Sequence, residues 1–458
     1  MSEVTVSLVN PATGERSRSV ACDSPAALEA KLEGARAARK RWRERPLRER
    51  VAAVAAAMEY FRAEREAVAR DVSLEMGKPI AQARGEVDTL LARTQYMLGI
   101  AERELAPDRL PAKAGFELRI EHEPLGLVLC IAPWNYPLIV PGNVIVPALA
   151  AGNAVVLKHS PKSPSVGVHF ERALAKLPEP VFANVLVPDA AAGKLVADPR
   201  CDFVAFTGSV RTGRSVYETA SRRLAPVGLE LGGKDPAYVA ADADIAFAAE
   251  NIVDGACYNA GQSCCAVERA YVHESRYAEF LERAEKVLRN YVIGDPLDEA
   301  TTLGPLVDRA ALRTVGLHVV DALQRGARLV CGGKQVLDRP GFFFEPTLLA
   351  DVPDDALVMR EETFGPVLPV RSVASDDEAL ALMNDSRYGL TASVWTRDQA
   401  RAERFVRELE AGTVFQNRCD YLDPSLAWTG VKESGLGATL SRYGYLHLTR
   451  LKSVHARR

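Results

Sequence analysis

The sequence contains 458 residues, which is enough for two or three domains with large buried cores. Its formal net charge is −3 at pH 7, and acidic and basic residues are mixed along the chain, which argues against nucleic acid as a partner. The eight cysteines form no Cys-x-x-Cys pair and have no histidine at metal-ligand spacing, so neither a disulfide framework nor a metal site is predicted. Since residues 1–10 show no secretory signal, we expect a reducing, cytoplasmic location.

The N-terminal region predicts helices. Residues 25–105 are rich in Ala, Arg, Glu and Leu, and they place Val51, Val54, Met58 and Phe61 at helical spacing. We therefore expect several consecutive amphipathic helices in this region.

An uncharged stretch runs from Leu125 to Leu157 and is long enough to cross a bilayer. Four prolines interrupt it, at positions 133, 137, 141 and 147. Because a continuous helix does not survive prolines at this spacing, we interpret the stretch as two buried strands joined by a loop and a short helix. No membrane span is expected.

Short apolar runs alternate with helix-like segments from residue 126 onward. In the first half the runs are 127–132, 154–157, 182–187, 203–206 and 227–231. In the second half we expect helices over 242–257 and 275–290, and strands at 270–273 and near 328–331, 367–372 and 413–416. This alternation predicts an α/β protein with two doubly wound, mainly parallel sheets. The sequence pattern alone places the boundary between the two sheets near residue 230.

Three polar side chains are candidates for chemistry. Cys264 follows a predicted helix at a turn, and Glu230 ends an apolar strand directly before two glycines, where α/β enzymes place catalytic groups. Asn135 lies between prolines and aromatic residues, where a side-chain amide can donate to an oxyanion. Each has a simpler interpretation: a buried structural thiol, a partner for Lys234, and an asparagine that satisfies its own turn.

The evidence for a phosphate-binding site is limited to one turn between a predicted strand and a predicted helix. The sequence has no Gly-x-Gly-x-x-Gly and no P-loop pattern. Phe206–Ser209, with Gly213 five residues after Gly208, follows a strand and opens a helix. This arrangement suits a pyrophosphate at a helix N-terminus, but it also suits an ordinary turn.

Seven motifs, in a fixed order from about residue 8 to residue 455, resemble those of the aldehyde dehydrogenase superfamily. They are Pro133–Pro137 (PWNYP), Lys158, Phe206–Ser209 (FTGS), Glu230–Lys234 (ELGGK), Gly261–Cys264 (GQSC), Glu361–Pro366 (EETFGP) and Lys432–Gly437 (KESGLG). Asn10–Glu15 (NPATGE) is similar to the usual start of this family, which implies a chain without a targeting extension. The resemblance implies a Rossmann-like cofactor domain, a catalytic domain and a small β oligomerisation element.

The resemblance also implies NAD(P)-dependent oxidation of an aldehyde to a carboxylic acid. The Cys264 thiolate would attack the aldehyde, the Asn135 amide and the Cys264 N–H would stabilise the oxyanion, and hydride transfer would leave a thioester. Glu230 would activate water for hydrolysis of that thioester. CoA-acylating relatives lack this glutamate, so acyl-CoA formation is the disfavoured alternative. A non-catalytic binding protein would have lost one of these three residues.

For the cofactor, the resemblance implies a cleft that holds both riboses and the pyrophosphate. Its residues would be Ile131, Trp134, Lys158, Gly208, Ser209, Gly213, Leu231, Glu362 and Phe364. Glu362 would bind the nicotinamide ribose, Phe364 would pack near the ring, and Lys158 would reach the adenosine ribose. Pro161 stands where many NAD-preferring relatives have a glutamate that repels a 2′-phosphate, and His159 or Lys162 could attract that phosphate. We therefore expect NAD or NADP, with dual use.

The position of the motifs also predicts an aldehyde tunnel. Its residues would be Tyr136, Tyr258, Ser263, Cys265 and Trp428. These side chains are aromatic or small and uncharged, which favours an apolar aliphatic or aromatic aldehyde. An arginine such as Arg93 or Arg418 could enter the tunnel, so a succinate-semialdehyde-type substrate stays open as the alternative.

By the same resemblance, the cofactor-binding domain covers 1–113 and 125–229, the catalytic domain covers 230–425, and the oligomerisation element covers 114–124 and 440–455. In the family the C-terminal tail joins a hairpin near 115–124, and here residues 440–454 alternate enough apolar residues to form a strand. A homodimer, or a homotetramer built from dimers, is therefore expected.

Overall fold

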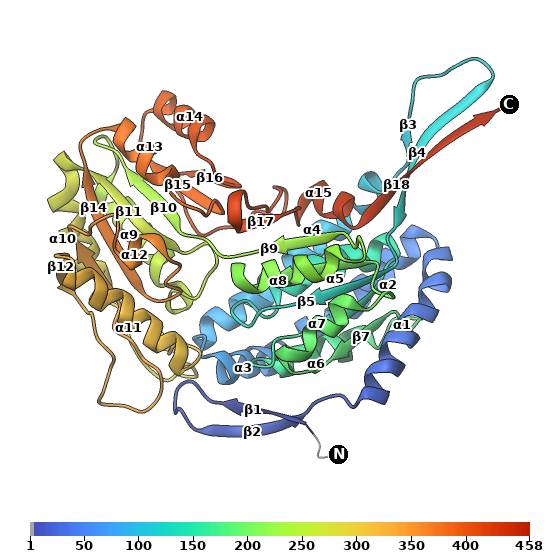
Figure 1. Ribbon diagram of the computed structural model, residues 1–458, viewed down its shortest axis with the longest axis horizontal. Coiled ribbons are helices and arrows are strands. Elements are labelled where there is room, and N and C mark those ends of the chain that lie inside the picture. Colours follow the sequence, from blue (N-terminus) through green and yellow to red (C-terminus); the bar gives the residue numbers. More distant parts are fainter. Residues whose placement is uncertain (1–3) are drawn as a thin grey trace.

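Two large sheets lie side by side in the computed structural model, which describes residues 4–458 (Figure 1). Helices cover both sheets, and a separate cluster of buried apolar side chains packs around each. The predicted architecture, two α/β domains with mainly parallel sheets, is confirmed.

The chain begins with a hairpin followed by four helices. The strands are β1 (Thr5–Val9) and β2 (Arg16–Ala21), and the helices are α1 (Pro25–Glu44), α2 (Leu47–Ala63), α3 (Arg65–Met76) and α4 (Ile80–Glu104). Ser24 caps α1, since its hydroxyl accepts the Ala27 N–H at 3.2 Å. Helix α3 ends at Gly77, whose φ of 83° is strained for other residues.

The first sheet is parallel except for one short strand. Its strands are β5 (Leu127–Ile131), β6 (Ala154–Lys158), β7 (Phe182–Val185), β8 (Phe203–Thr207), β9 (Val227–Glu230) and β17 (Gly435–Leu436), and its crossover helices are α5 (Ile139–Ala151), α6 (Pro164–Leu174), α7 (Asp189–Ala197) and α8 (Val210–Ser221). The order is β17-β9-β8-β5-β6-β7, so the chain runs from β5 to β7 and then returns to the other side of β5. Ligand sites of open α/β sheets form at the carboxyl ends of strands at such a reversal.

The second sheet has seven strands in the order β12-β13-β14-β11-β10-β15-β16 and is parallel except between β12 and β13. The strands are β10 (Asp235–Val239), β11 (Val267–His273), β12 (Arg328–Cys331), β13 (Thr347–Ala350), β14 (Val367–Val373), β15 (Thr391–Trp395) and β16 (Thr413–Gln416). The α-helices are α9 (Ile245–Cys257), α10 (Tyr277–Leu288), α11 (Arg309–Gln324), α12 (Leu357–Arg360), α13 (Asp376–Asn384) and α14 (Gln399–Glu408). Short 3₁₀ turns are η1 (Tyr258–Gly261), η2 (Glu274–Arg276) and η3 (Lys432–Ser434).

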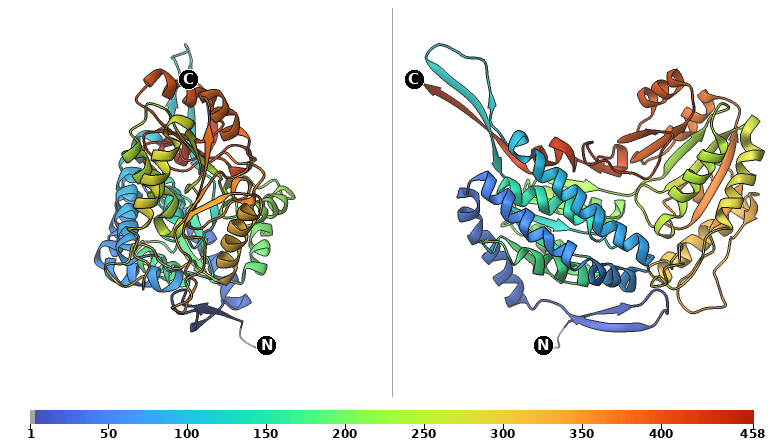
Figure 2. Two further views of the ribbon diagram at one scale, coloured as in Figure 1. Left: turned by 90° about the vertical axis from the view of Figure 1, so that its left-hand side faces the viewer. Right: turned by 180° about the vertical axis from the view of Figure 1, so that it is seen from behind.

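A three-stranded ribbon projects from one end of the molecule (Figures 1 and 2). It consists of β3 (Asp108–Arg109), β4 (Phe116–Pro124) and β18 (Thr449–Arg457), and β18 pairs antiparallel with β4. The expectation of a strand over 440–454 is wrong in its first half, because residues 441–447 form helix α15 (Ser441–His447). Tyr445 and Leu448, three residues apart, are buried together with Leu440, and α15 packs against α4 and α5.

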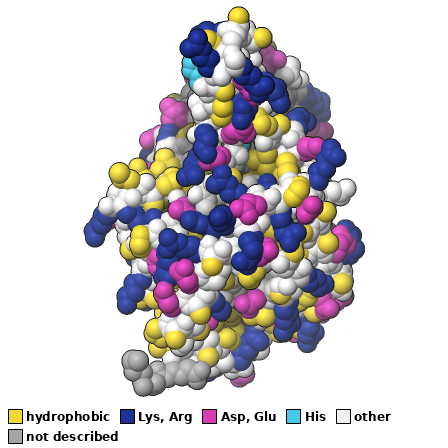
Figure 3. Space-filling model, turned by 90° about the vertical axis from the view of Figure 1, so that its right-hand side faces the viewer, with side chains coloured by type: hydrophobic (Ala, Val, Ile, Leu, Met, Phe, Trp, Pro, Cys, Tyr) yellow, Lys and Arg dark blue, Asp and Glu magenta, His cyan; other side chains and the backbone are white. Residues whose placement is uncertain are grey.

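The surface mixes charges of both signs. Acidic and basic side chains are interspersed over the face in Figure 3, from the body to the projecting ribbon. Among residues 4–458, no helix combines the length and the apolar composition that a membrane crossing requires.

Candidate active site

Several predicted residues meet at the carboxyl edge of the first sheet. Ile131 and Lys158 end β5 and β6 in register with each other. Thr207 and Glu230 end β8 and β9 in the same way, and the Gly208 N–H donates to the Glu230 carbonyl at 3.0 Å. Because the order of the strands reverses at β5, this edge is where the fold favours a bound ligand.

Helix α8 starts directly after this edge. Its N-cap is Ser209, whose hydroxyl accepts the Thr212 N–H at 3.4 Å. Gly213 lies in the first turns of α8, and a Cβ there would collide with the Leu231 side chain, so glycine lets the helix approach closely. The partial positive charge of a helix N-terminus suits a pyrophosphate at this position.

Cys264 lies in a turn after α9 with an unusual backbone. Asn259 and Ala260 have φ values of 53° and 56°, which are uncommon for residues other than glycine. Gly261 has a φ of 69°, and a Cβ there would collide with the Gly365 carbonyl. The turn leaves Cys264 half-buried. Backbone strain of this kind clusters at functional sites.

Buried amide side chains tie this turn to the first domain. Asn135 Nδ2 donates to the Gln262 carbonyl at 3.2 Å, and Asn259 Nδ2 donates to the Asn135 carbonyl at 3.1 Å. Gln262 Oε1 accepts the Val307 N–H at 2.8 Å. Asn135 therefore lies against the turn that carries Cys264, although its side chain is outside the wall of the cavity described next.

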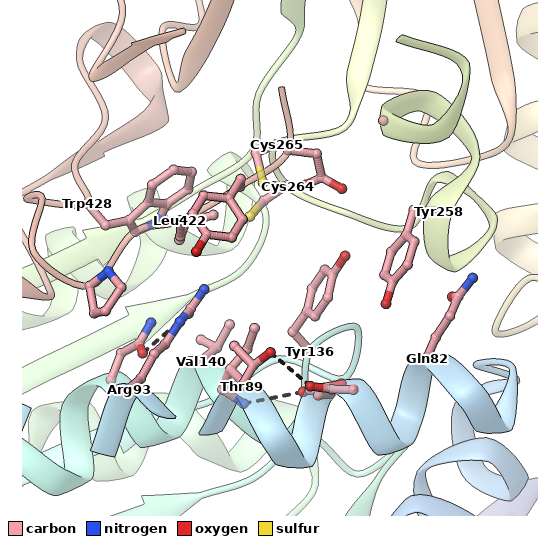
Figure 4. A pocket seen from close by; sticks show the side chains of 18 of the residues that line it. Gln82, Thr89, Arg93, Tyr136, Val140, Tyr258, Cys264, Cys265, Leu422 and Trp428 are labelled. Carbon is pink, nitrogen blue, oxygen red and sulfur yellow. Dashed lines mark hydrogen bonds between the residues drawn. The ribbon is translucent and has the colours of Figure 1, made fainter. Parts of the chain in front are cut away.

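A cavity of about 430 Å³ opens in front of Cys264 (Figure 4). It brings together Cys264, Glu230, Tyr136, Tyr258, Cys265 and Trp428 from the predicted set. Ser263 is not part of its wall: the residue is buried, and its hydroxyl donates to Asp420 at 3.2 Å. Of the two arginines considered, Arg93 lines the cavity, whereas Arg418 stacks over the Tyr421 ring.

Glu230 lines the cavity and is half-buried. Its Oε1 accepts a short hydrogen bond from the Thr439 hydroxyl. Burial raises the pKa of Glu230 to about 7, although the Thr439 hydroxyl and the Arg93 guanidinium favour the charged form. A carboxylate with this pKa can take up a proton near neutral pH.

Cys265 faces a second carboxylate, Asp420. Asp420 Oδ1 accepts from the Cys265 thiol at 2.9 Å, and burial raises the pKa of Asp420 to about 7. A hydrogen bond with Cys264, burial and the Asp420 charge raise the pKa of the Cys265 thiol well above its ordinary value. Cys265 therefore stays protonated, which leaves Cys264 as the candidate nucleophile of the pair.

Residues 362–364 approach the first sheet from the second domain. Glu362 Oε1 accepts the Gly233 N–H at 3.2 Å, and burial is the main cause that raises the pKa of Glu362. The Phe364 ring packs edge-on against Trp134 with centroids 5.6 Å apart. The predicted cofactor residues of the two domains are thus in direct contact.

A buried ion pair between Lys234 and Glu268 holds this segment. Glu268 accepts the N–H groups of Thr363 and Phe364 at 2.8 and 2.9 Å. Lys234 Nζ also donates to the Thr363 hydroxyl at 3.1 Å. The backbone beside Glu362 is therefore fixed from within the second domain.

Lys158 is buried at the end of β6, and its ammonium contacts the Asp189 carboxylate at the start of α7. The Asp189 side chain is 74% exposed. A carboxylate therefore stands beside Lys158, although it comes from a different strand–helix turn than the one that contains Pro161.

The structure separates the two groups expected to attract a 2′-phosphate. His159 is buried, its Nε2 lies 2.9 Å from the Pro137 carbonyl, and burial lowers the pKa of His159 to about 4. His159 is therefore neutral at physiological pH, and the expectation is corrected for this residue. Lys162 is partly exposed and forms an ion pair with Asp308 at 2.6 Å, and its attraction for a 2′-phosphate stays a prediction.

Comparison with known proteins places the chain. The model of the aldehyde dehydrogenase family matches residues 1–454. The chain belongs to this family.

Its relatives cover almost its whole length. It is 37% identical over 450 residues to a succinate-semialdehyde dehydrogenase (NADP(+)) of Deinococcus radiodurans, which covers 98% of this chain and 94% of that protein. It is 36% identical over 456 residues to an aldehyde dehydrogenase of Paenarthrobacter nicotinovorans, over 98% of this chain and 99% of that protein. An NAD-dependent aldehyde dehydrogenase from Sinorhizobium meliloti has a TM-score of 0.96 at 36% identity, over 99% of this chain and 92% of that structure.

As an aldehyde dehydrogenase, the protein is an NAD(P)-dependent oxidoreductase that acts on an aldehyde, which confirms the activity predicted from the motifs. Both cofactors occur among its relatives and structural neighbours, in agreement with the expectation of NAD or NADP.

The residues around the motifs of this aldehyde dehydrogenase were missed. Asp420, Asn259 and Thr439 support or touch the predicted residues from loops that carry no recognised motif, and Gln262, which is part of the GQSC motif, was given no role of its own. The two amides Asn259 and Gln262, five and two residues before Cys264, were the one usable signal. Asp420 and Thr439 approach through tertiary folding and left no local sequence signal.

Proposed function

We propose that this aldehyde dehydrogenase forms a thioester on Cys264 and releases the carboxylic acid by hydrolysis. The observation that carries the proposal is that Cys264 and Glu230 line one cavity, at the strand edge where the fold favours a ligand. A nucleophile and a carboxylate base on the same cavity supply both halves of the reaction.

In the first half, the Cys264 sulfur adds to the aldehyde carbon, and the aldehyde oxygen becomes an oxyanion. An asparagine NH₂ has two hydrogens, and Asn135 uses one on the Gln262 carbonyl at 3.2 Å, so the second can serve the oxyanion together with the Cys264 backbone N–H. Bound NAD or NADP supplies the hydride acceptor. The aldehyde hydrogen leaves with both electrons of its bond to carbon, as a hydride, and the acyl group stays on the Cys264 sulfur as a thioester.

In the second half, Glu230 takes a proton from a water molecule as that water attacks the thioester carbon. The carbon–sulfur bond breaks, the acid is released and Cys264 is restored as a thiolate. A pKa of about 7 lets Glu230 act as a base at neutral pH and then return its proton to solvent. The presence of Glu230 favours water over CoA as the acceptor of the acyl group.

The dinucleotide would lie along the carboxyl edge of the first sheet. Gly213 lets α8 approach Leu231, and the N-terminus of α8 can hold the pyrophosphate. Lys158 would hold the adenosine ribose, and Glu362 the nicotinamide ribose. Ile131 and Trp134, with Gly208, Ser209 and Phe364, would complete the walls.

We also propose assembly through the ribbon of β3, β4 and β18, as a homodimer or as a tetramer of dimers, in a cytoplasmic location. Strand β18 is an edge of this ribbon, so its unpaired backbone groups can pair with a second copy, and Leu110 and Leu451 are exposed on the same projecting segment, at 46% and 66%. The domain division into 1–113 with 125–229, 230–425, and 114–124 with 440–455 remains part of the same proposal.

The test is Cys264→Ala compared with Cys22→Ala, a half-buried cysteine outside the cavity. Cys264→Ala should abolish NAD(P)H formation, and the affinity for NAD(P), measured by fluorescence titration, should stay within about threefold of the parent enzyme. Cys22→Ala should keep its activity. Residual turnover above about one per cent in Cys264→Ala would refute the nucleophile assignment.

A further inference from the structure

The cavity in front of Cys264 contains a buried arginine. Arg93 projects from α4 into the cavity and is 7% exposed (Figure 4). Its Nη1 makes one long hydrogen bond of 3.5 Å to the Asn143 side chain of α5. Its Nε is buried and has no hydrogen-bond partner among residues 4–458.

A guanidinium has five N–H donors and carries a full charge at any physiological pH. Burial of such a group is costly unless a carboxylate or several acceptors surround it. Arg93 has a single neutral acceptor, and within the described chain no carboxylate lies in ion-pair distance of it. The charge is therefore buried and poorly compensated.

The two cavity carboxylates whose charge acts on Arg93, Glu86 and Glu230, already have partners. Glu86 forms a buried ion pair with Lys78 and accepts the Leu138 N–H at 2.8 Å. Glu230 accepts from Thr439, as described above. Neither of these groups is placed to neutralise Arg93 by a direct contact, although both act on it at longer range.

We propose that Arg93 is a substrate-binding residue that receives a carboxylate carried by the aldehyde, so that the substrate is an ω-carboxylated aldehyde rather than an apolar one. This inference rests on the proposed function, because it takes the cavity in front of Cys264 as the aldehyde site. A carboxylate can accept two N–H groups of a guanidinium in parallel, which would use the donors that the protein leaves unused.

A preference of the cavity for a positively charged aldehyde is less well supported than a preference for a carboxylated one. Asp420 could in principle hold an amino-aldehyde, but its Oδ1 already accepts from Ser263 and Cys265 at 3.2 and 2.9 Å. Burial also raises the pKa of Asp420 to about 7, so that it is partly neutral at physiological pH. Arg93 is fully charged and nearly unused, and it therefore decides the charge of the substrate.

The first test uses the parent enzyme with two four-carbon probes, succinate semialdehyde and butanal, which differ in the terminal carboxylate. We expect kcat/KM to be about a hundredfold or more higher for succinate semialdehyde, since a buried polar site discriminates strongly against an analogue that leaves it unpaired. Equal or higher kcat/KM for butanal would overturn the inference while the proposed function stands. Absence of NAD(P)H formation with every aldehyde of a wide panel would instead contradict the proposed function.

The second test replaces the charge. Arg93→Met should lower the ratio of kcat/KM between the two probes by at least tenfold, and Arg93→Lys should restore part of it. Arg103→Met, on the exposed face of the same helix, should leave the ratio unchanged. A ratio that survives in Arg93→Met would overturn the assignment.

Binding without turnover gives an independent measurement. Succinate should inhibit the parent enzyme competitively against the aldehyde and raise its melting temperature, and both effects should be lost in Arg93→Met. If Arg93→Met does not fold, the comparison of probes in the parent enzyme and in Arg93→Lys decides the matter. Inhibition by succinate that is equal in the parent enzyme and in a folded Arg93→Met would count against the proposal.

Discussion

At the scale of single residues, the environment of each carboxylate determines its chemistry. Glu230 and Asp420 both lie against the cavity and both have pKa values raised to about 7 by burial, yet their hydrogen bonds differ. Asp420 is held between Ser263 and a protonated Cys265, which gives it a structural task. Glu230 is held by Thr439 and faces the space in front of Cys264, where water can reach it.

The pH dependence of thioester hydrolysis should follow Glu230. The base acts as the carboxylate, so below its pKa of about 7 the rate should fall by about tenfold per pH unit, and above it the rate should level off. Glu230→Gln should remove this fall in rate at low pH, the acidic limb of the pH profile. It should also slow hydrolysis by about a hundredfold or more, so that acyl-enzyme accumulates. The decay of isolated acyl-enzyme between pH 5.5 and 9 measures this without interference from the ionisation of free Cys264. If the limb persists in Glu230→Gln, another group such as Asp420 is the base.

The choice of cofactor should depend on Asp189. The Asp189 carboxylate contacts Lys158 and competes with a 2′-phosphate for the same ammonium. Asp189→Asn should therefore raise the NADP to NAD ratio of kcat/KM by about tenfold, because one repulsive charge near the phosphate disappears. Asp355→Asn, a similarly exposed aspartate on the second domain, is the control. An unchanged ratio in Asp189→Asn would mean that this carboxylate does not face the ribose.

At the scale of elements, the sequence predicted what had a local signal. Runs such as Leu127–Ile131 and Ala154–Lys158 were found because they are apolar throughout, as strands buried on both faces are. Strand β15 (Thr391–Trp395) was missed, because Thr391 and Ser393 are polar residues that the fold buries. A related limit applies to Arg93, because the sequence named it beside Arg418 without deciding between them, and only the tertiary packing of α4 against α5 shows that Arg93 lines the cavity.

The segment 362–364 should lose its support when Glu268 is removed. Glu268→Ala leaves the buried Lys234 charge and two N–H groups without their acceptor, which costs about 3–5 kcal/mol. We expect a fall in melting temperature of about 10 °C, measured calorimetrically. The double variant Lys234→Met with Glu268→Leu should recover part of it, and Asp88→Ala, which breaks an exposed pair with Arg65, should change it little. A shift below about 2 °C for Glu268→Ala would show that the pair is dispensable.

At the scale of the whole molecule, the reaction site depends on both domains. The first sheet supplies Glu230 at the end of β9, the loop after β5 supplies Asn135, the second domain supplies Cys264 and Glu362, and the amide contacts of Asn135, Asn259 and Gln262 join them. The third unit, the ribbon of β3, β4 and β18, projects away from this site (Figure 2). Among residues 4–458, no residue of β3, β4 or β18 lines the cavity in front of Cys264, so assembly is the function that we propose for the ribbon.

Removal of the last strand should test that assembly. A chain that ends at Leu448 lacks β18 and leaves β4 with β3 as its remaining partner, because β18 pairs with β4 from Thr449 to Arg457. The truncation removes the edge strand of the ribbon, whose unpaired backbone groups and exposed Leu451 are the features that a second copy would contact. We expect a monomer by sedimentation velocity at micromolar concentration, whereas removal of Arg458 alone should leave the mass of the assembly unchanged. A truncated chain that keeps the mass of the full assembly would place the interface on the body of the protein, and the exposed Leu451 would then have no part in it.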